Sequence, residues 1–254
     1  MTPAGQGTGG VGAEPSAHRL PQAVLRPVRD GNAFEATVEQ LATSVRLGVF
    51  APGQHLPPER ELAETLGVSR STLREAIAAL RDAGMVQTRR GRGGGTVVIY
   101  RGPDPASTPE ALRGMDSAQI RDALDYRRVV EPGAAALAAS RELSADQRQW
   151  LVASRVAVEQ AADVAEHRQA DSRLHLALAT VSGSDLLVAA VTQVQAMVHD
   201  MLTAIPVLAT NIGHSNAQHR AVVDAVLSGD PQGARLAMEQ HCDATSALLR
   251  GLLA

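Results

Sequence analysis

The stretch LAETLGVSRSTLREAIAAL, residues 62–80, has the pattern of two short helices joined by a tight turn. The small Ala63 allows the helices to approach closely, and Gly67 can adopt the positive φ that such a turn often needs. Three apolar residues repeat at helical spacing and should face inward: Leu73, Ile77 and Leu80. The stretch therefore predicts a helix-turn-helix, a motif whose second helix enters the major groove of DNA.

Arginines occupy the other face of the predicted second helix, at Arg70, Arg74 and Arg81. A guanidinium group can bond to phosphates, and its planar fork matches the O6 and N7 acceptors of guanine. All 24 basic residues of the chain are arginine. Between Ser69 and Arg101 seven arginines face two acidic residues, although the whole chain has a net charge of −3. The positive charge is thus local, as expected of a DNA-reading surface.

The flanking sequence completes a larger unit. An amphipathic stripe precedes the motif, at Phe34, Val38, Leu41 and Val45. After it, residues 86–90 and 96–100 have the β-branched pattern of strands, and the glycine-rich residues 91–95 between them form a turn. Helix, helix-turn-helix and basic hairpin, in this order, predict a winged helix.

Composition limits the remaining possibilities. A length of 254 residues suits two modest domains, and an aromatic content of 2% favours helical packing. The single cysteine excludes an intramolecular disulfide. No long apolar run suggests a membrane span, and the N-terminus lacks the apolar core of a signal peptide. We expect a cytoplasmic protein without a membrane partner.

The chain divides into four segments on sequence pattern. Residues 1–32 are expected to be a disordered tail, 33–100 the winged helix, 101–117 a proline-containing linker, and 118–254 an all-α antiparallel helical bundle. Serines at 144 and 184 should cap helices. The first helix should break or bend near residues 132–133. The predicted helices are 118–140, 145–164, 166–182, 184–204, 211–228 and 231–252.

Four side chains in the helical region could hold a divalent ion. Asp171 and His175 are four residues apart, so they share a helix face. His219 and His241 fall in register with apolar residues on two later helices and should point inward. Three imidazoles and a carboxylate suit a metal site in a bundle. Spacing alone leaves open a surface pair and hydrogen-bonded core histidines. Cys242 is expected to be a buried thiol.

The stretch LPPERELAETLGVSRSTLREAIAALRDAGMVQTRRGRGGGTVV resembles the winged-helix signature of the GntR family of bacterial transcription regulators. Two departures are visible. Pro58 replaces a usual serine, so a capping box is absent, and Thr72 replaces a common proline, with Ser71 as the expected N-cap. The resemblance implies DNA contacts from Arg60, Arg70, Ser71, Arg74, Arg92, Gly93 and Gly94.

The stretches EPGAAALAA, DSRLH and HRAVVDAVLSGDPQGARLAMEQH are similar to the FCD effector domain of the FadR subfamily. This resemblance implies that a divalent ion is bound by Asp171, His175, His219 and His241. Zinc is the expected ion, and nickel and manganese are alternatives. The resemblance also implies a small carboxylate effector beside the ion. Arg127 is a candidate anchor for that carboxylate. A salt bridge from Arg127 to Asp122, Asp125 or Glu131 is an equal alternative. Ser184 replaces an asparagine common in the family.

Three functions follow from these observations. The leading one is a homodimeric regulator, expected to be a repressor, that binds a double-stranded DNA operator under control of the effector and is not an enzyme. The second is a metal-dependent enzyme acting on a small carboxylate, although the sequence has no H-E-x-x-H motif and no phosphate-binding loop. The third is a nucleoid protein, which would bind DNA without sequence preference.

Overall fold

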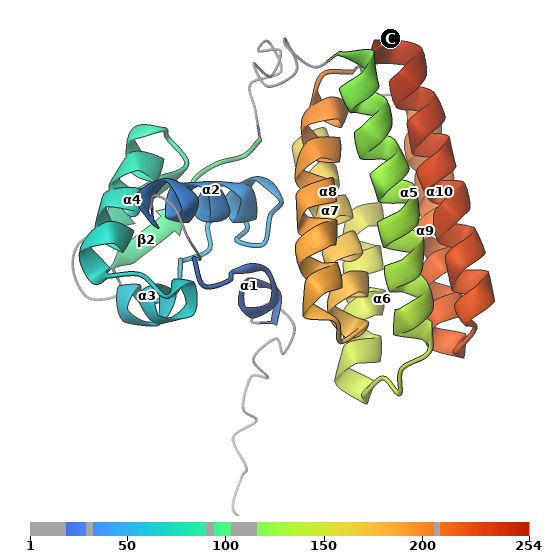
Figure 1. Cartoon of the computed structure of the whole chain (residues 1–254), viewed down its shortest axis with the longest axis horizontal. Helices are drawn as coiled ribbons and strands as arrows, with labels where there is room; N and C mark the ends of the chain where they lie inside the picture. Colours follow the sequence, from blue (N-terminus) through green and yellow to red (C-terminus); the bar gives the residue numbers. More distant parts are fainter. Residues whose placement is uncertain (1–18, 29–32, 90–93, 103–115, 206–208, 254) are drawn as a thin grey trace, which may run out of the picture.

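The computed structural model describes residues 19–28, 33–89, 94–102, 116–205 and 209–253. Figure 1 shows two parts side by side, a small domain with three helices and a hairpin and a bundle of long helices. This arrangement confirms the predicted fold class, which is mainly α with an N-terminal winged helix and a C-terminal all-helical domain.

The small domain is a winged helix. Its helices are α2 (Ala33–Arg46), α3 (Glu59–Leu66) and α4 (Arg70–Asp82), followed by strands β1 (Val86–Arg89) and β2 (Gly95–Val98). The strands pair antiparallel with Val86 opposite Val98. Their apolar face and the inward faces of the three helices bury one core, which includes Leu41, Val45, Leu62, Leu66, Leu73, Ile77 and Leu80.

The turn between α3 and α4 is set by local backbone chemistry. Gly67 ends α3 with φ +64, a conformation that costs glycine little. Pro58 precedes α3 without any side-chain cap, as expected. The N-cap of α4 is Ser69, whose hydroxyl accepts a hydrogen bond from the Thr72 amide. The expectation of Ser71 as the cap was therefore wrong, because the helix begins two residues earlier than that cap implies, at Arg70.

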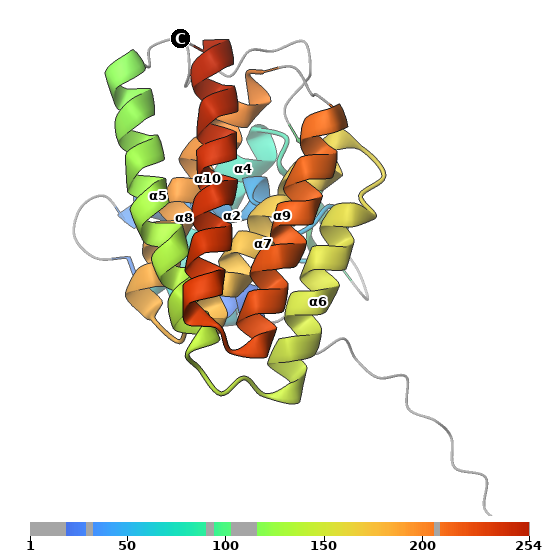
Figure 2. The same cartoon turned by 90° about the vertical axis from the view of Figure 1, so that its right-hand side faces the viewer.

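Six helices form the second domain: α5 (Ser117–Ala139), α6 (Ala145–Glu159), α7 (Val164–Val181), α8 (Asp185–Thr203), α9 (Ala209–Ser228) and α10 (Pro231–Leu253). Contacts between neighbours close a ring in the order α5, α10, α9, α6, α7, α8, and Figure 2 shows these helices standing side by side. Both Ser144 and Ser184 cap the helices that follow them, as their sequence positions suggested.

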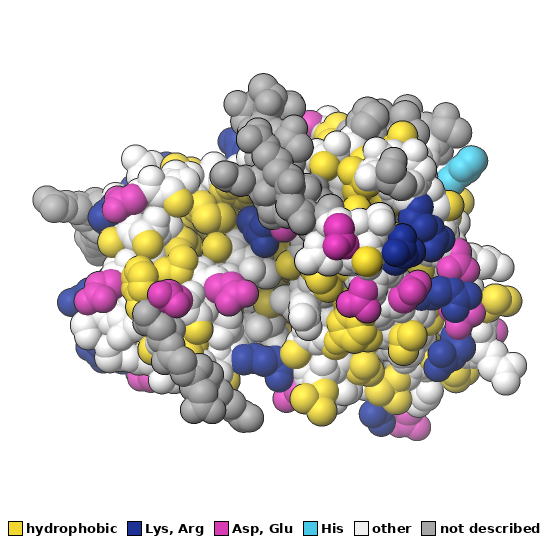
Figure 3. All heavy atoms as spheres, turned by 45° about the horizontal axis from the view of Figure 1, so that its top comes forward, with side chains coloured by type: hydrophobic (Ala, Val, Ile, Leu, Met, Phe, Trp, Pro, Cys, Tyr) yellow, Lys and Arg dark blue, Asp and Glu magenta, His cyan; other side chains and the backbone are white. Residues whose placement is uncertain are grey.

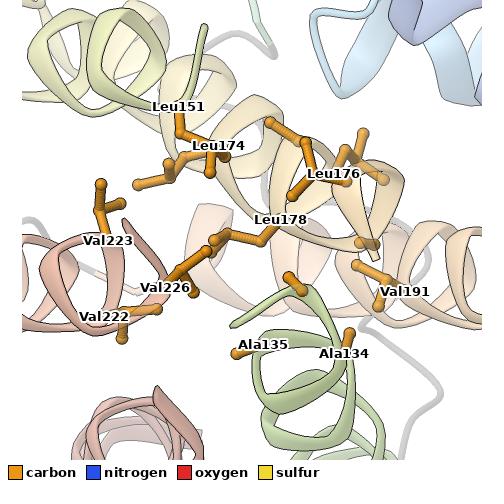
Figure 4. Packing of buried hydrophobic residues seen from close by; sticks show 14 of the residues in the cluster. Ala134, Ala135, Leu151, Leu174, Leu176, Leu178, Val191, Val222, Val223 and Val226 are labelled. Carbon is orange, nitrogen blue, oxygen red and sulfur yellow. The ribbon is translucent and has the colours of Figure 1, made fainter. Parts of the chain in front are cut away.

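The core of the bundle is built from alanine, valine and leucine. Figure 4 shows Leu174 and Leu178 of α7 among valines of α9 and alanines of α5. Of the break or bend expected near residue 132, the break does not occur, since α5 continues through Pro132 as one helix of 23 residues. Burial of Val130, Ala134 and Ala135 on both sides of the proline offsets the hydrogen bond that proline removes.

One helix, Asp185–Thr203, is long and apolar enough by length and composition to cross a membrane. This helix is α8, and it packs against α5 and α7 inside the bundle. A core helix of a folded domain passes the same test, and here the contacts account for its apolar character.

The segment before the winged helix corrects the expectation of a disordered tail through residue 32. Within it, α1 (Arg19–Val24) contacts α7 and α8, and Leu20 and Val24 are buried in the core of the bundle. The next residues return to the winged helix, where the Val28 amide donates to the Leu66 carbonyl. Apolar burial therefore orders residues 19–28 between the two domains.

Direct contacts also join the domains. The side chain of Gln169 on α7 donates to the Val45 carbonyl at 3.4 Å. One turn further along α7, Arg173 donates to the Gly48 carbonyl at the same distance. Gly48 has φ +70, and a Cβ atom on it would lie 2.8 Å from the Cβ of Gln169. A side chain at position 48 would thus collide with α7.

Figure 3 shows one face of the molecule, on which arginine and acidic side chains alternate over both domains. No large region of one sign covers the described part of this face.

Candidate functional site

Three buried histidines meet in the interior of the bundle. His175 on α7, His219 on α9 and His241 on α10 each offer a ring nitrogen, and these atoms lie within 4.8 Å of one another. The ring centroids are 4.5–5.4 Å apart. Sequence spacing predicted that His219 and His241 point inward, and the fold brings His175 into the same cluster.

Asp171 lies at the edge of this cluster. Its Oδ1 is 3.3 Å from Nε2 of His219, and its Oδ2 is 3.9 Å from Nε2 of His175. The carboxylate is close to two of the three imidazoles, and its side chain keeps 15% of its surface exposed. The four residues singled out in the sequence therefore form one group.

The ring nitrogens of the cluster fit a metal ion. Both nitrogens of His219 and Nε2 of His175 are buried without a hydrogen-bond partner among the described residues. Leaving buried polar atoms unpaired is costly, and a bound cation would satisfy them. His241 contacts Gln218 through Nδ1 at 3.2 Å, which leaves Nε2 for a ligand bond. Three imidazoles and one carboxylate suit zinc or a similar divalent ion.

Electrostatics keep these groups in the form that binds metal. Burial lowers the pKa of His219 to about 4, although Asp171 opposes the shift. Burial and the neighbouring His219 also place the pKa of His241 well below its usual value. For Asp171, burial would raise the pKa, but the nearby histidines outweigh it and the pKa is lowered. Neutral imidazoles and an ionised carboxylate are the states that metal ligation needs.

A second layer of the site was missed by the sequence reasoning. Glu131 on α5 is buried, and its Oε2 lies 2.9 Å from Nδ1 of His175 and 3.1 Å from Nε of Arg127. Its Oε1 accepts from Gln195 at 2.5 Å. Burial alone would raise the pKa of Glu131, but Arg127 and His175 hold it well below its usual range. A carboxylate behind a metal-binding histidine fixes the ring and increases its basicity.

Arg127 combines both roles considered for it. Its Nε forms the expected salt bridge to Glu131, while its Nη1 is buried without a hydrogen-bond partner among the described residues. Burial would lower the pKa of Arg127, but Glu131 raises it, so the group stays charged. Part of a buried, charged guanidinium is therefore available to another anion.

This guanidinium lies on the wall of a cavity of about 80 Å³. Asp171 and His241 line the same cavity, so it adjoins the histidine cluster. By this measure a water molecule needs about 10–15 Å³, so the space accepts a small organic molecule. The polar lining also includes His167, Arg168, Asn211, Ser215 and Thr245.

Other candidates lie outside the cluster. Cys242 is buried, its thiol lies 3.7 Å from Glu131, and burial raises the pKa of this thiol to about 12. His214 is exposed. His199 is buried on α8 with both ring nitrogens unpaired among the described residues, and burial lowers its pKa to about 4.

The candidate DNA interface lies on α3 and α4. Arg60, Arg70, Ser71 and Arg74 are all exposed. The Nε of Arg74 donates to Glu59 at 2.7 Å, and Arg60 pairs with Glu64 along α3. At the wing tip, Arg92 and Gly93 fall outside the described residues, while Gly94 is exposed. Exposure of these side chains leaves them accessible to a DNA duplex.

A winged helix with exposed arginines, joined to a bundle that encloses a histidine cluster and a cavity, defines a DNA-binding transcription regulator with a separate effector domain. Residues 34–98 match the bacterial regulatory proteins of the gntR family, and residues 122–244 match the FCD domain. The chain belongs to the GntR family and carries an FCD domain, as the sequence resemblance indicated.

Relatives agree with this assignment. The chain is 33% identical over 208 residues to the "Putative L-lactate dehydrogenase operon regulatory protein" of Escherichia coli K12, covering 74% of this chain and 75% of that protein. It is 30% identical over 221 residues to the Glc operon transcriptional activator of the same organism, covering 82% and 85%.

Among solved structures, E. coli McbR/YncC superposes with a TM-score of 0.53 at 18% identity, covering 87% of this chain and 99% of that chain, which shows the shared fold. The family and the relatives are transcription regulators, so the protein is a regulator and not an enzyme. Regulators of this family bind operator DNA and form dimers, and FCD domains bind metal.

Proposed function

We propose that this protein is a homodimeric repressor in the cytoplasm, whose affinity for an operator is controlled by a small organic acid bound beside a divalent metal. The observation that carries the proposal is the cluster of unpaired, buried ring nitrogens at His175 and His219, next to a cavity with a free guanidinium edge at Arg127. A purely structural core would have paired these atoms.

The ion would be held by Asp171, His175, His219 and His241. Zinc is the expected ion, and nickel and manganese are alternatives. The ion would supply positive charge and open coordination positions facing the cavity. Arg127 would bind the carboxylate of the acid through its free Nη1. The relative named for an L-lactate dehydrogenase operon supports a small acid as the effector class.

Transmission to DNA would pass through α7. One face of this helix carries Asp171 and His175, while Gln169 contacts the last turn of α2 and Arg173 contacts Gly48, just after α2. An acid that binds one position of α7 more tightly would therefore change how the winged helix is held. Only such a difference in affinity between two states can shift the DNA-binding equilibrium.

The DNA contacts proposed for each copy are Arg60, Arg70, Ser71, Arg74, Arg92, Gly93 and Gly94. Two copies would read a short pseudo-palindrome, so footprints should show two half-sites. Light scattering at micromolar concentration should give twice the chain mass of 26.6 kDa. A mass of one chain, on and off DNA, would contradict the dimer.

The site is tested with the full-length chain stripped of metal and titrated with zinc. One ion per chain should bind, and a carboxylate such as L-lactate should bind only after metal is added. His219→Ala should lose both metal and acid, whereas His214→Ala, an exposed histidine on the same helix, should keep both. If the stripped protein takes up no zinc, nickel or manganese, the four residues are a polar core cluster and the proposal fails.

A further inference from the structure

A second arginine faces the cavity, and none of the roles above uses it. Arg168 lies on α7, three residues before Asp171, and both side chains line the cavity. It is partly buried, and it makes no hydrogen bond or ion pair within the described part of the chain. Burial lowers the pKa of Arg168, with Asp171 opposing the shift. A guanidinium that lines the cavity without a protein partner is available to pair with a carboxylate bound there.

The net charge around the cavity, with a divalent ion bound, would be balanced by a ligand that carries two negative charges. Arg127 and Arg168 supply two positive charges, and Glu131 and Asp171 supply two negative ones, so the protein groups balance. A divalent ion then adds two uncompensated positive charges in a partly enclosed site, where a doubly negative ligand is favoured.

We infer that the effector is a dicarboxylic acid, with one carboxylate on the side of the histidine cluster and Arg127 and the other paired with Arg168. This inference rests on the proposed function, because it assumes an acid in this cavity. It adds a second anionic group to the ligand and assigns Arg168 as the residue that distinguishes diacids from monoacids. A guanidinium group binds a carboxylate through two parallel hydrogen bonds, which makes Arg168 suited to this selection.

The size and lining of the cavity are consistent with a short diacid. Its volume of about 80 Å³ corresponds to about six water-sized groups by the same measure. A space of this size favours a short acid over a long one. Apolar side chains complete the lining and would contact the methylene groups: Val164, Leu202, Ile205, Ile212 and Leu248.

Calorimetry on the full-length, zinc-loaded protein tests this inference with acids matched in length. Succinate is compared with butanoate, and L-malate with (S)-2-hydroxybutanoate, so that a carboxylate replaces a methyl group in each pair. At least one diacid should bind about 10–100-fold more tightly than its partner, the range expected for a charge-assisted hydrogen-bond pair. Arg168→Gln should remove this difference and leave the affinity for the monoacid and for zinc unchanged. Arg235→Gln, an exposed arginine on α10, is the matched control and should change nothing.

Two results would overturn the inference separately from the proposed function. If a monoacid binds as tightly as its diacid and still requires zinc and Arg127, the effector is a monoacid and only the role of Arg168 is wrong. The same conclusion follows if Arg168→Gln weakens both members of a pair equally. If none of these acids binds, or if binding is indifferent to a chelator, the proposed effector site fails and the inference fails with it.

Discussion

Nη1 of Arg46 lies 2.8 Å from Oδ1 of Asp200. Arg46 is in the last turn of α2, and Asp200 is near the C-terminal end of α8, so this ion pair connects the winged helix to the bundle. Both side chains are mostly buried, with 31% and 21% of their surface exposed. The pair lies at the same end of the bundle as Leu202 and Ile205, which line the cavity.

Asp200→Asn should reduce the effect of the acid on operator affinity. A partly exposed pair contributes about 0.2–1 kcal/mol, so the ratio of operator affinities with and without acid should fall by up to about fivefold. Fluorescence anisotropy with labelled operator DNA measures this ratio. Asp224→Asn, on the exposed side of α9, removes the same charge and should leave the ratio intact. An unchanged ratio in Asp200→Asn would show that the ion pair carries no coupling.

Arg74→Ala should weaken specific binding by about 1–3 kcal/mol and relax the preference at one operator position. Arg74 is exposed on α4, and its contact with Glu59 on α3 orients it in the free protein. A competition gel shift against operators with single changes measures both effects. Arg235→Ala is a control on α10. Equal affinity and selectivity in Arg74→Ala and the unmodified protein would remove Arg74 from the reading surface.

Substitutions of Arg127 and Glu131, which form a buried ion pair, should have non-additive effects on the free energy of unfolding. Arg127→Met and Glu131→Met should each reduce the free energy of unfolding by about 3–5 kcal/mol, because each leaves a buried charge without its partner. The double variant should cost less than the sum by about 0.5–3 kcal/mol. Urea denaturation of the four proteins gives the values. Additive costs would mean that the two side chains act independently.

Acid should destabilise the metal-free protein well above the range in which carboxylates titrate. Burial lowers the pKa of His219 and His199 to about 4, whereas an unfolded histidine titrates near 6.5. Between these values the unfolded chain binds protons that the folded chain does not. The free energy of unfolding should therefore fall as the pH drops from 6.5 towards 4, by up to about 1.4 kcal/mol per pH unit for each such histidine. Urea titrations in a chelator at pH 7, 6 and 5 measure the slope. His219→Asn should make it shallower and His214→Asn should not; a flat profile would contradict neutral buried imidazoles.

The sequence predicted the parts of the fold that local patterns encode. Helical spacing correctly predicted that Leu73 and Ile77 lie in the core of the winged helix. The same spacing argument correctly predicted that His219 and His241 are buried in the bundle. Pattern could not reveal contacts between distant segments. Glu131 behind His175 joins α5 to α7, and only the i, i+4 spacing of Arg127 and Glu131 hinted at it.

Residues 19–28 were missed for a related reason. The glycine- and proline-rich sequence around them gives no sign of the short helix that they contain. The apolar side chains of this helix, including Leu20, are buried only by packing against the folded bundle. At Pro132 the helix is not interrupted, because burial on both sides of the proline outweighs its local preference for ending a helix. In each case tertiary packing decided what local chemistry left open.

The absence of a side chain at Gly48 determines how closely the winged helix can approach α7. A single methyl group there would lie 2.8 Å from Cβ of Gln169 and 3.1 Å from Nη1 of Arg173, so it would act as a wedge between the winged helix and α7. A substitution at this one position would therefore change the spacing of the two domains without altering any residue proposed to read DNA or to line the cavity.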